Sequence, residues 1–198
     1  QKAHFLQLMQ TESLAALNCQ LDDDMVIIRG AGTAGFKGNL AIPGDRVRCQ
    51  NFIANFLQLP NPAMLRIHLI DSGAFTDQPE PLISIGGSAS LAAFAAATNT
   101  ETDARRFRLN IMVTTTTAFA ENQWGSAKLQ MGEAVIEIMD NVERCAAINV
   151  DPASAIRQPD HLATMRQAFG HNYLGVFGRV IKTGAVQCGD TVRVITSN

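Results

Sequence analysis

The chain has 198 residues, of which 46% are hydrophobic, and a formal net charge of −2 with an isoelectric point near 6.1. This length and apolar content suffice to bury a substantial core in one domain, or in one domain with a small appendage, and exclude a disordered tail. The small net charge excludes the broad basic field that attracts nucleic acid or an anionic membrane, so we expect neither as a partner.

Two further features bear on where the protein works. The longest strongly apolar stretch, residues 90–97, is far shorter than the roughly 20 residues of a membrane-spanning helix. The four cysteines are widely scattered without a Cys-x-x-Cys pair, which favours reduced cytosolic thiols over disulfides or a structural zinc site. We therefore expect a cytoplasmic protein. Because the chain begins at Gln1 without a methionine, we also expect residues upstream of it.

The hydrophobic patterns predict many short strands and few helices. Helices are expected at 11–18, 47–57, 88–98 and 160–169. Strands are expected at 5–9, 25–29, 64–70, 82–85, 107–113, 134–142, 145–150, 174–181 and 191–195. This pattern favours a barrel or strongly curved sheet over a doubly wound sheet. We predict a mixed α and β fold, mainly β, in which a terminal hairpin over 180–195 helps to close a barrel and the later helices pack outside it.

A basic segment is the first candidate site. Side chains alternate along a strand, so Arg106, Arg108 and Asn110 are expected to share one face while the apolar residues between them face the core. A guanidinium suits a phosphate group, and an asparagine amide can bind the edge of a ring. The alternative is a solvated strand face with salt bridges to nearby acidic residues.

A second candidate lies where the expected strand 82–85 runs through Gly86 and Gly87 into a helix capped by Ser88. Such a helix start leaves backbone N–H groups and the positive end of the helix dipole open to an anion. The alternative is an ordinary glycine-containing turn with a serine cap.

Cys145 is the third candidate, because it follows Arg144 directly. A thiolate rather than a thiol binds metals or carries sulfur, and a neighbouring guanidinium favours the thiolate. Soft sulfur donors suit a transition metal such as molybdenum. The alternative is a core cysteine in the expected strand 145–150, since strict alternation places Arg144 and Cys145 on opposite faces.

Several segments, taken in order, resemble the MOSC superfamily, which is named for the C-terminal domain of molybdenum cofactor sulfurases. They are Phe75-Thr76-Asp77, Pro81-Leu82-Ile83-Ser84, Ala89-Ser90-Leu91, Arg106-Phe107-Arg108-Leu109-Asn110-Ile111, Phe119-Ala120-Glu121 with Trp124, Arg144-Cys145, Val150-Asp151-Pro152, Gly170-His171, Gly175-Val176-Phe177, Gly184 and Gly189-Asp190. Each segment is a weak signal, whereas the ordered set over residues 75–195 is specific. The predicted domains are a partial N-terminal segment over 1–70 and a MOSC domain over 71–198.

The resemblance implies a MOSC-type β-barrel with a few peripheral helices that binds the molybdenum cofactor (molybdopterin) or a sulfur atom destined for it. Family members include amidoxime-reducing proteins, in which the matching cysteine ligates molybdenum. By this resemblance Cys145 is the metal ligand and catalytic residue. The implied cofactor contacts are Arg106, Arg108, Asn110, Arg144, Gly87 and Ser88. Pyridoxal phosphate is not expected, since the lysine that holds it in full sulfurases belongs to another domain.

The sequence departs from the family pattern around the cysteine. The hydroxyl-rich stretch after it is replaced by Ala146-Ala147-Ile148-Asn149, and the Asp-Pro-x-Thr-Gly turn by Asp151-Pro152-Ala153-Ser154-Ala155. Fewer side-chain donors are therefore expected around the metal. No ferredoxin-like cluster motif follows, so reduction would need a separate electron-donor protein.

Three functional interpretations remain open. The first is a molybdenum-dependent oxidoreductase acting on N-oxygenated or similar small molecules. The second is a non-catalytic carrier that holds the cofactor or a sulfur atom on Cys145 and transfers it to a partner protein. The third is a small-molecule-binding barrel without metal.

Overall fold

A computed structural model describes residues 5–30, 32–70, 78 and 80–195. The chain divides into two compact units: residues 1–73 with 150–157, and residues 74–149 with 158–198. We call them the N-terminal unit and the sheet unit. The predicted domain boundary at residue 70 falls directly before residues 71–77, which lie outside the described residues, as does the Phe75-Thr76-Asp77 segment of the resemblance.

The N-terminal unit is a three-stranded antiparallel sheet with one long helix. Its strands are β1 (Leu17–Asp22), β2 (Met25–Gly30) and β3 (Phe36–Gly38), and its helix is α1 (Pro43–Phe56). Pro43 suits the first turn of α1, because the N–H group that proline lacks has no partner within the helix there. The buried core of this unit is formed by Ile28, Phe36 and Cys49.

Residues 150–157 belong to the N-terminal unit and are held there by Arg157. Its Nη2 donates to the carbonyl of Met9 at 2.9 Å and to the carboxylate of Glu12 at 3.1 Å. Val150 and Arg157 form an antiparallel bridge, which closes this segment into a loop. The loop is therefore fixed to residues that lie more than 130 positions earlier in the chain.

Three predictions for the first 70 residues are wrong. The expected helix 11–18 is a 3₁₀ helix over Glu12–Ala16 that gives way to β1, and the expected strand 5–9 forms turns. The expected strand 64–70 follows the 3₁₀ helix Pro62–Met64 without regular structure. Short apolar runs do not distinguish a strand from a turn. The sequence does not predict β1, because almost all of its residues are exposed and lack the apolar alternation of a half-buried strand.

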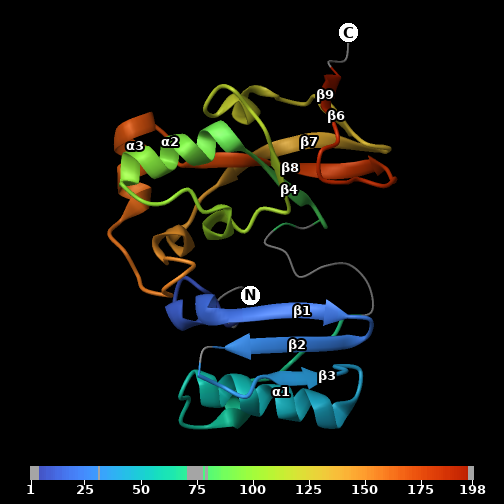
Figure 1. The fold of residues 1–198 in the computed structure, drawn as a ribbon, viewed down its shortest axis with the longest axis vertical. Coiled ribbons are helices and arrows are strands. Elements are labelled where there is room, and N and C mark those ends of the chain that lie inside the picture. Colours follow the sequence, from blue (N-terminus) through green and yellow to red (C-terminus); the bar gives the residue numbers. More distant parts are fainter. Residues whose placement is uncertain (1–4, 31, 71–77, 79, 196–198) are drawn as a thin grey trace. The chain divides into compact units, whose positions relative to one another are not determined.

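The sheet unit contains a curled sheet of six strands (Figure 1). The strands are β4 (Ile83–Gly87), β5 (Ile111–Val113), β6 (Lys128–Met131), β7 (Ala134–Glu143), β8 (Tyr173–Lys182) and β9 (Val192–Ile195). Their order is β5-β4-β8-β7-β6-β9, and all neighbours are antiparallel except β4 and β5. The predicted mixed α and β fold, with few helices around a barrel-like sheet, is confirmed.

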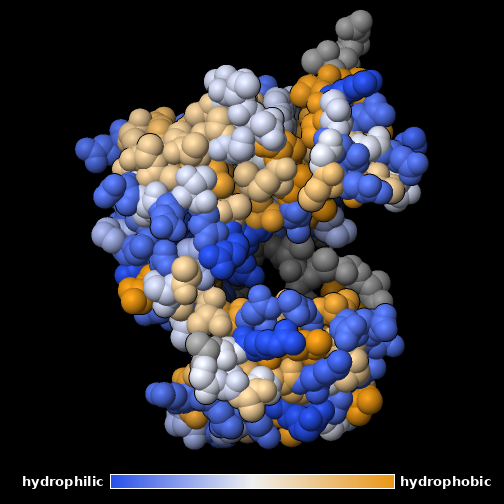
Figure 2. All heavy atoms as spheres, in the orientation of Figure 1, coloured by the Kyte–Doolittle hydropathy of each residue, from blue (hydrophilic) through white to orange (hydrophobic). Residues whose placement is uncertain are grey.

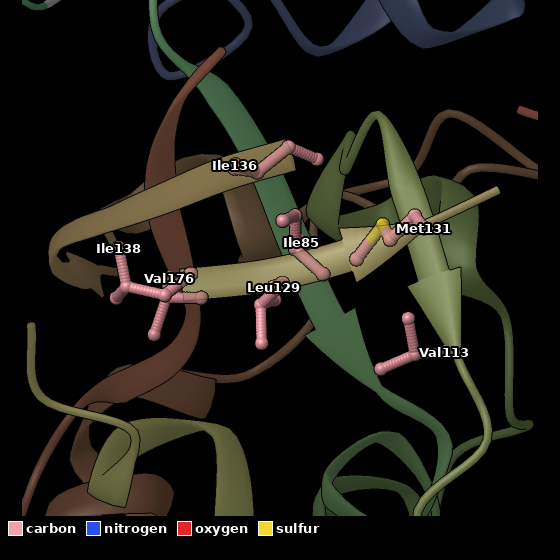
Figure 3. Close-up of a cluster of buried hydrophobic side chains, with 7 residues drawn as sticks. All are labelled: Ile85, Val113, Leu129, Met131, Ile136, Ile138 and Val176. Carbon is pink, nitrogen blue, oxygen red and sulfur yellow. The ribbon is translucent and has the colours of Figure 1, made fainter. Parts of the chain in front are cut away.

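One face of this sheet carries the first of two hydrophobic clusters. Alternation along β7 buries Ile136 and Ile138, which meet Ile85 of β4 and Val176 of β8. Figure 3 shows these side chains together with Val113, Leu129 and Met131. The β7–β8 ladder shifts its register at three places, which is typical of β-bulges and bends the strands.

The second cluster joins the sheet to two helices, α2 (Ser88–Thr98) and α3 (His161–Phe169), which lie side by side (Figure 1). It comprises Leu91, Phe94, Phe107, Ile148, Met165 and Leu174. The predicted ends of α3 are confirmed: the Asp160 carboxylate accepts from two N–H groups of the first turn, and Gly170 ends the helix at φ +75°. The predicted bounds of α2 are also confirmed, but the predicted cap is wrong, because Ser88 is the first helical residue and Gly87 is the N-cap, without a side-chain hydrogen bond.

Three predictions within the sheet unit are wrong. The expected strand 107–113 is reduced to β5, since a 3₁₀ helix over Ala104–Phe107 precedes it. The expected strand 145–150 is a 3₁₀ helix over Ala146–Asn149. The terminal hairpin does not form, because β9 pairs with β6 rather than with β8. Such pairing between distant strands leaves no local signal in the sequence.

β9 is the least buried strand of this sheet, since it has no buried residue. Val194 and Ile195 are each more than 40% exposed, and Figure 2 shows apolar surface at this end of the unit.

Among the described residues, no helix combines the length and apolar character needed to cross a membrane.

Candidate functional site

Cys145 lies between the end of β7 and the 3₁₀ helix Ala146–Asn149, and it is exposed. Its carbonyl accepts from the N–H of Ile148 at 3.2 Å, which closes the first turn of that helix. The preceding residue, Arg144, is buried. The interpretation of Cys145 as a core residue is therefore wrong, and its thiol is open to a ligand.

Arg144 is held by backbone carbonyls rather than turned toward a ligand. Its Nε donates to Leu174 O at 2.8 Å and its Nη1 to Phe107 O at 2.9 Å, while the guanidinium lies over the Phe107 ring at 5.3 Å. Burial lowers the pKa of Arg144 to about 10, against the opposing effect of negative charge at Cys145 and Glu121. The group is therefore still charged near neutral pH, and it donates to the carbonyls of Leu174 and Phe107.

Arg106 donates to a backbone carbonyl of the Cys145 loop, just as Arg144 donates to a carbonyl of the segment that carries Arg106. It is buried in the 3₁₀ helix Ala104–Phe107, and its Nη1 donates to Ile148 O at 2.9 Å. Arg106 thus reaches from residues 104–110 to the Cys145 loop, while Arg144 reaches from the Cys145 loop back to Phe107. We call these bonds the reciprocal arginine contacts. They tie the two loops together.

Arg105 and Arg108 are the exposed arginines of this segment, and Arg105 forms an ion pair with Asp103 at 2.6 Å. The backbone of Arg108 has φ +52°, a left-handed conformation that is uncommon outside glycine, and its N–H donates to Arg105 O at 3.2 Å. This turn places the exposed Arg108 next to the buried Phe107. The exposed side chain of Arg108 is therefore available to an anion, and it follows Phe107, whose carbonyl accepts from Arg144.

Asn110 joins two strands rather than facing a ligand. Its Oδ1 accepts from Ser84 N at 2.9 Å and from Ser84 Oγ at 3.0 Å, and its own N–H donates to Ser84 O at 3.0 Å. The predicted common face of Arg106, Arg108 and Asn110 is therefore wrong. One is buried, one lies in a left-handed turn, and one fixes the approach to β5 beside β4.

The start of α2 is closed by a buried carboxylate. Glu121 is fully buried, and it accepts from Gly87 N at 3.2 Å and from Ser90 Oγ at 2.8 Å. Thr115 Oγ1 accepts from Ala89 N at 3.1 Å. The N–H groups of Gly87 and Ala89 are therefore not open to an anion, because Glu121 and Thr115 already accept from them.

Gly87 is required by this arrangement. A Cβ at this position would lie 2.6 Å from Glu121 Oε2 and 2.8 Å from Thr115 Oγ1. Only glycine lets the carboxylate approach the backbone so closely. The Gly-Gly sequence that suggested an anion site thus accommodates an anion of the protein itself.

Sequence reasoning missed two polar residues that organise the region. Glu121 belongs to a family-like segment, but no local pattern reveals that a single carboxylate is buried. Asn172 is also buried, and its Nδ2 donates to Arg144 O at 3.2 Å and to Glu143 Oε1 at 3.1 Å. The N–H of Arg144 donates in turn to Asn172 O at 2.9 Å.

An aromatic cluster stands at the end of β8 that pairs with the Cys145 end of β7. His171 packs edge-on against Phe119 with ring centroids 4.8 Å apart, and it stacks on Tyr173 at 5.9 Å. Phe119 and Phe169 are 4.7 Å apart. The Tyr173 N–H donates to His171 Nδ1 at 3.2 Å. The imidazole is therefore fixed by both packing and a hydrogen bond.

The sheet unit also has a pocket of about 220 Å³. It is lined by Gln78, Glu80, Leu82, Met139, Asp140, Phe177 and Arg179. None of the predicted site residues lines it, so we do not associate it with Cys145.

The residues fit the predicted molybdenum cofactor at two positions. The exposed Cys145 thiol is a soft donor, and the exposed Arg108 guanidinium suits a phosphate. The start of α2 does not fit a phosphate, because Glu121 would repel it. No group of three or more His, Cys, Asp and Glu side chains in the described part of the chain could hold a metal ion.

Comparison with protein families gives one match. The family model described as the MOSC domain matches residues 72–193, which is more than half of the chain. A search of curated proteins found no match. The matched range contains the seven predicted site residues, Gly87, Ser88, Arg106, Arg108, Asn110, Arg144 and Cys145.

Proposed function

The chain belongs to the MOSC domain family, which is associated with the molybdenum cofactor, and from this we propose that it binds this cofactor through Cys145 and Arg108. We further propose that it is an oxidoreductase that reduces N-oxygenated or similar small molecules. The observation that carries this proposal is the exposure of Cys145 and Arg108 on two loops that the reciprocal arginine contacts tie together.

Each residue has a distinct part in the proposed site. Cys145 supplies the thiolate ligand of the metal. Arg108 binds the phosphate of the cofactor. Arg106 and Arg144 are positioning residues, since their guanidinium groups hold backbone carbonyls. When bound, the cofactor supplies two-electron exchange of an oxygen atom with the substrate.

The proposed reaction needs electrons and protons from outside the chain. Reduction of an N-oxide consumes two electrons and two protons and releases the amine and water. A separate electron-donor protein is the proposed physiological source, and reduced viologen serves as an artificial donor. The proposed partners are thus a small-molecule substrate and this donor or a protein that delivers the cofactor.

Replacement of the proposed ligand tests this function. We expect protein purified from a host that makes the cofactor to contain molybdenum and pterin, and to oxidise reduced viologen with pyridine N-oxide. Cys145→Ser should abolish this turnover and alter the sulfur coordination of molybdenum in X-ray absorption, because a serine alkoxide is a hard ligand that is disfavoured near neutral pH. Some pterin should remain bound through Arg108.

The exposed cysteines on other elements provide the control. Cys19→Ser and Cys188→Ser should retain metal and turnover, since both thiols are exposed like Cys145 but lie outside the proposed site. Full activity and unchanged sulfur coordination in Cys145→Ser would contradict the proposal.

The exposed thiol also suits a second function, a non-catalytic carrier that holds the cofactor or a persulfide sulfur for a partner protein. In that case the wild-type protein should bind pterin or carry a persulfide but show no turnover with viologen. Cys145→Ser would then abolish persulfide labelling or transfer of the cofactor.

A further inference from the structure

The ladder between β7 and β8 ends two residues before Cys145 on β7 and begins two residues after His171 on β8. Its last register pair is Glu143 with Tyr173, and the next residues are joined by the bond from Arg144 N to Asn172 O. The next residue is Cys145 on the segment that follows β7, and His171 on the segment that precedes β8. Continued by two positions, this register sets His171 opposite the proposed metal ligand, although the spacing of the two residues in the sequence gives no sign of it.

One ring nitrogen of His171 already takes part in a hydrogen bond. Tyr173 N–H donates to His171 Nδ1, so Nδ1 accepts and carries no proton. The proton of the neutral ring is then on Nε2. The ring is packed edge-on against Phe119 and stacked on Tyr173, which restrains its rotation. Packing and the backbone bond together fix the tautomer and limit where Nε2 can point.

His171 is accessible enough to meet a small molecule. It is partly exposed, and Tyr173 beside it is 39% exposed, whereas Asn172 between them is buried. Alternation along the start of β8 thus turns His171 and Tyr173 away from the side on which Asn172 is buried. Glu143, the register partner of Tyr173, is exposed as well.

We propose that His171 recognises the oxygen atom of the substrate at the Cys145 site, by donating a hydrogen bond from its Nε2–H. This inference rests on the proposed function and specifies its substrate class: molecules whose oxygen is a strong hydrogen-bond acceptor, such as N-oxides. A prearranged donor is favourable because its orientation is fixed before the substrate binds. Phe119 and Tyr173 act as positioning residues, since they hold the imidazole.

Amide variants distinguish this role from a structural one. The side-chain amide of Gln extends to the region of Nε2, whereas the shorter Asn amide lies near Nδ1. If His171 serves the substrate, His171→Gln should retain much of the activity and His171→Asn should lose about tenfold in kcat/KM. If the bond from Tyr173 N–H is all that matters, Asn should restore activity and Gln should not.

His171→Phe provides the variant without a donor. A phenyl ring can keep the packing against Phe119 and Tyr173, so the fold and the molybdenum and pterin contents should be unchanged. We expect a loss of about tenfold in kcat/KM for pyridine N-oxide. His68→Phe is the matched control, because it makes the same substitution at an exposed position of the N-terminal unit.

A binding measurement that needs no turnover completes the test. In ¹⁵N NMR of the purified protein, His171 should show a protonated Nε2, and its resonance should shift with pyridine N-oxide and not with pyridine, which lacks the oxygen. Unchanged kinetics in a metal-loaded His171→Phe variant, or equal shifts with both ligands, would overturn the inference. Absence of molybdenum and pterin from the wild type would instead contradict the proposed function, while the NMR comparison would still test oxygen recognition.

Discussion

Burial separates two kinds of arginine around Cys145. Arg106 and Arg144 are buried and donate to backbone carbonyls, whereas Arg108 is exposed. A buried guanidinium that satisfies carbonyls contributes to the fold, and an exposed one is free to bind an anion. Substitutions at the two kinds of position should therefore change different properties.

Arg108→Ala should weaken cofactor retention and leave the fold intact. Loss of one charge-assisted contact costs about 1.5–3 kcal/mol, which is roughly ten- to hundredfold in affinity. Arg144→Ala should instead lower the free energy of unfolding by about 1–3 kcal/mol for each of Leu174 O and Phe107 O left without its donor. Urea unfolding and pterin content of both variants measure the two effects. Unchanged pterin content in a folded Arg108→Ala variant would count against Arg108 as a contact.

The alternation of side chains along an extended strand predicts the burial of some of these residues and not of others. It correctly places Arg144 and Cys145 on opposite sides, because the chain is still extended at the end of β7. It fails for Arg106 and Arg108, because the Asp103 side chain accepts from Arg105 N and starts a 3₁₀ helix. An aspartate followed by a helical turn is a known cap pattern, so the sequence held a signal for this turn.

The start of α2 is completed by a side chain from a later segment of the chain, the 3₁₀ helix that carries Glu121. The sequence predicts the helix bounds correctly from the Gly-Gly sequence before Ser88, although Gly87 and not Ser88 is the N-cap. It does not predict Glu121, because that carboxylate comes from a 3₁₀ helix more than 30 residues later. Only the packing of residues 119–123 on the sheet unit brings the acid to the helix start.

Removal of this acid should destabilise the sheet unit. Glu121→Ala leaves Gly87 N and Ser90 Oγ without their acceptor, and we expect the free energy of unfolding to fall by about 2–3 kcal/mol. Gln123→Ala, an exposed position on the same 3₁₀ helix, is the control and should change it by less than about 0.5 kcal/mol. Chemical denaturation measures both. Equal stability of the two variants would show that the buried carboxylate does not support α2.

At the scale of the whole molecule, stability should depend on the protonation of His161. This side chain is buried, with Nε2 3.0 Å from Gln158 Oε1. Burial and the positive charge of Arg106 lower its pKa below the ordinary value of 6.5, while Asp160 opposes the shift. The unfolded chain therefore binds a proton at a higher pH than the folded chain does, and the free energy of unfolding should fall as the pH drops below about 6.5.

Urea unfolding between pH 7.5 and about 5 tests this dependence, in a range above the titration of the carboxylates Asp45 and Asp103, whose pKa values are lowered. His161→Gln should reduce the slope because the variant cannot titrate there. His68→Gln, at an exposed position, should keep the slope of the wild type. An identical pH dependence in His161→Gln and the wild type would assign the slope to other groups.

The path of the chain between its two units has a consequence for protein engineering. The chain leaves the sheet unit after Asn149 and re-enters it at Gln158, and the N–H of Gln158 donates to Asn149 O at 2.7 Å. The excursion over 150–157 thus starts and ends at almost the same point. No single cut of the chain separates the two units, so an autonomous sheet unit requires an excision at this junction, with Asn149 rejoined to Gln158 through a short linker.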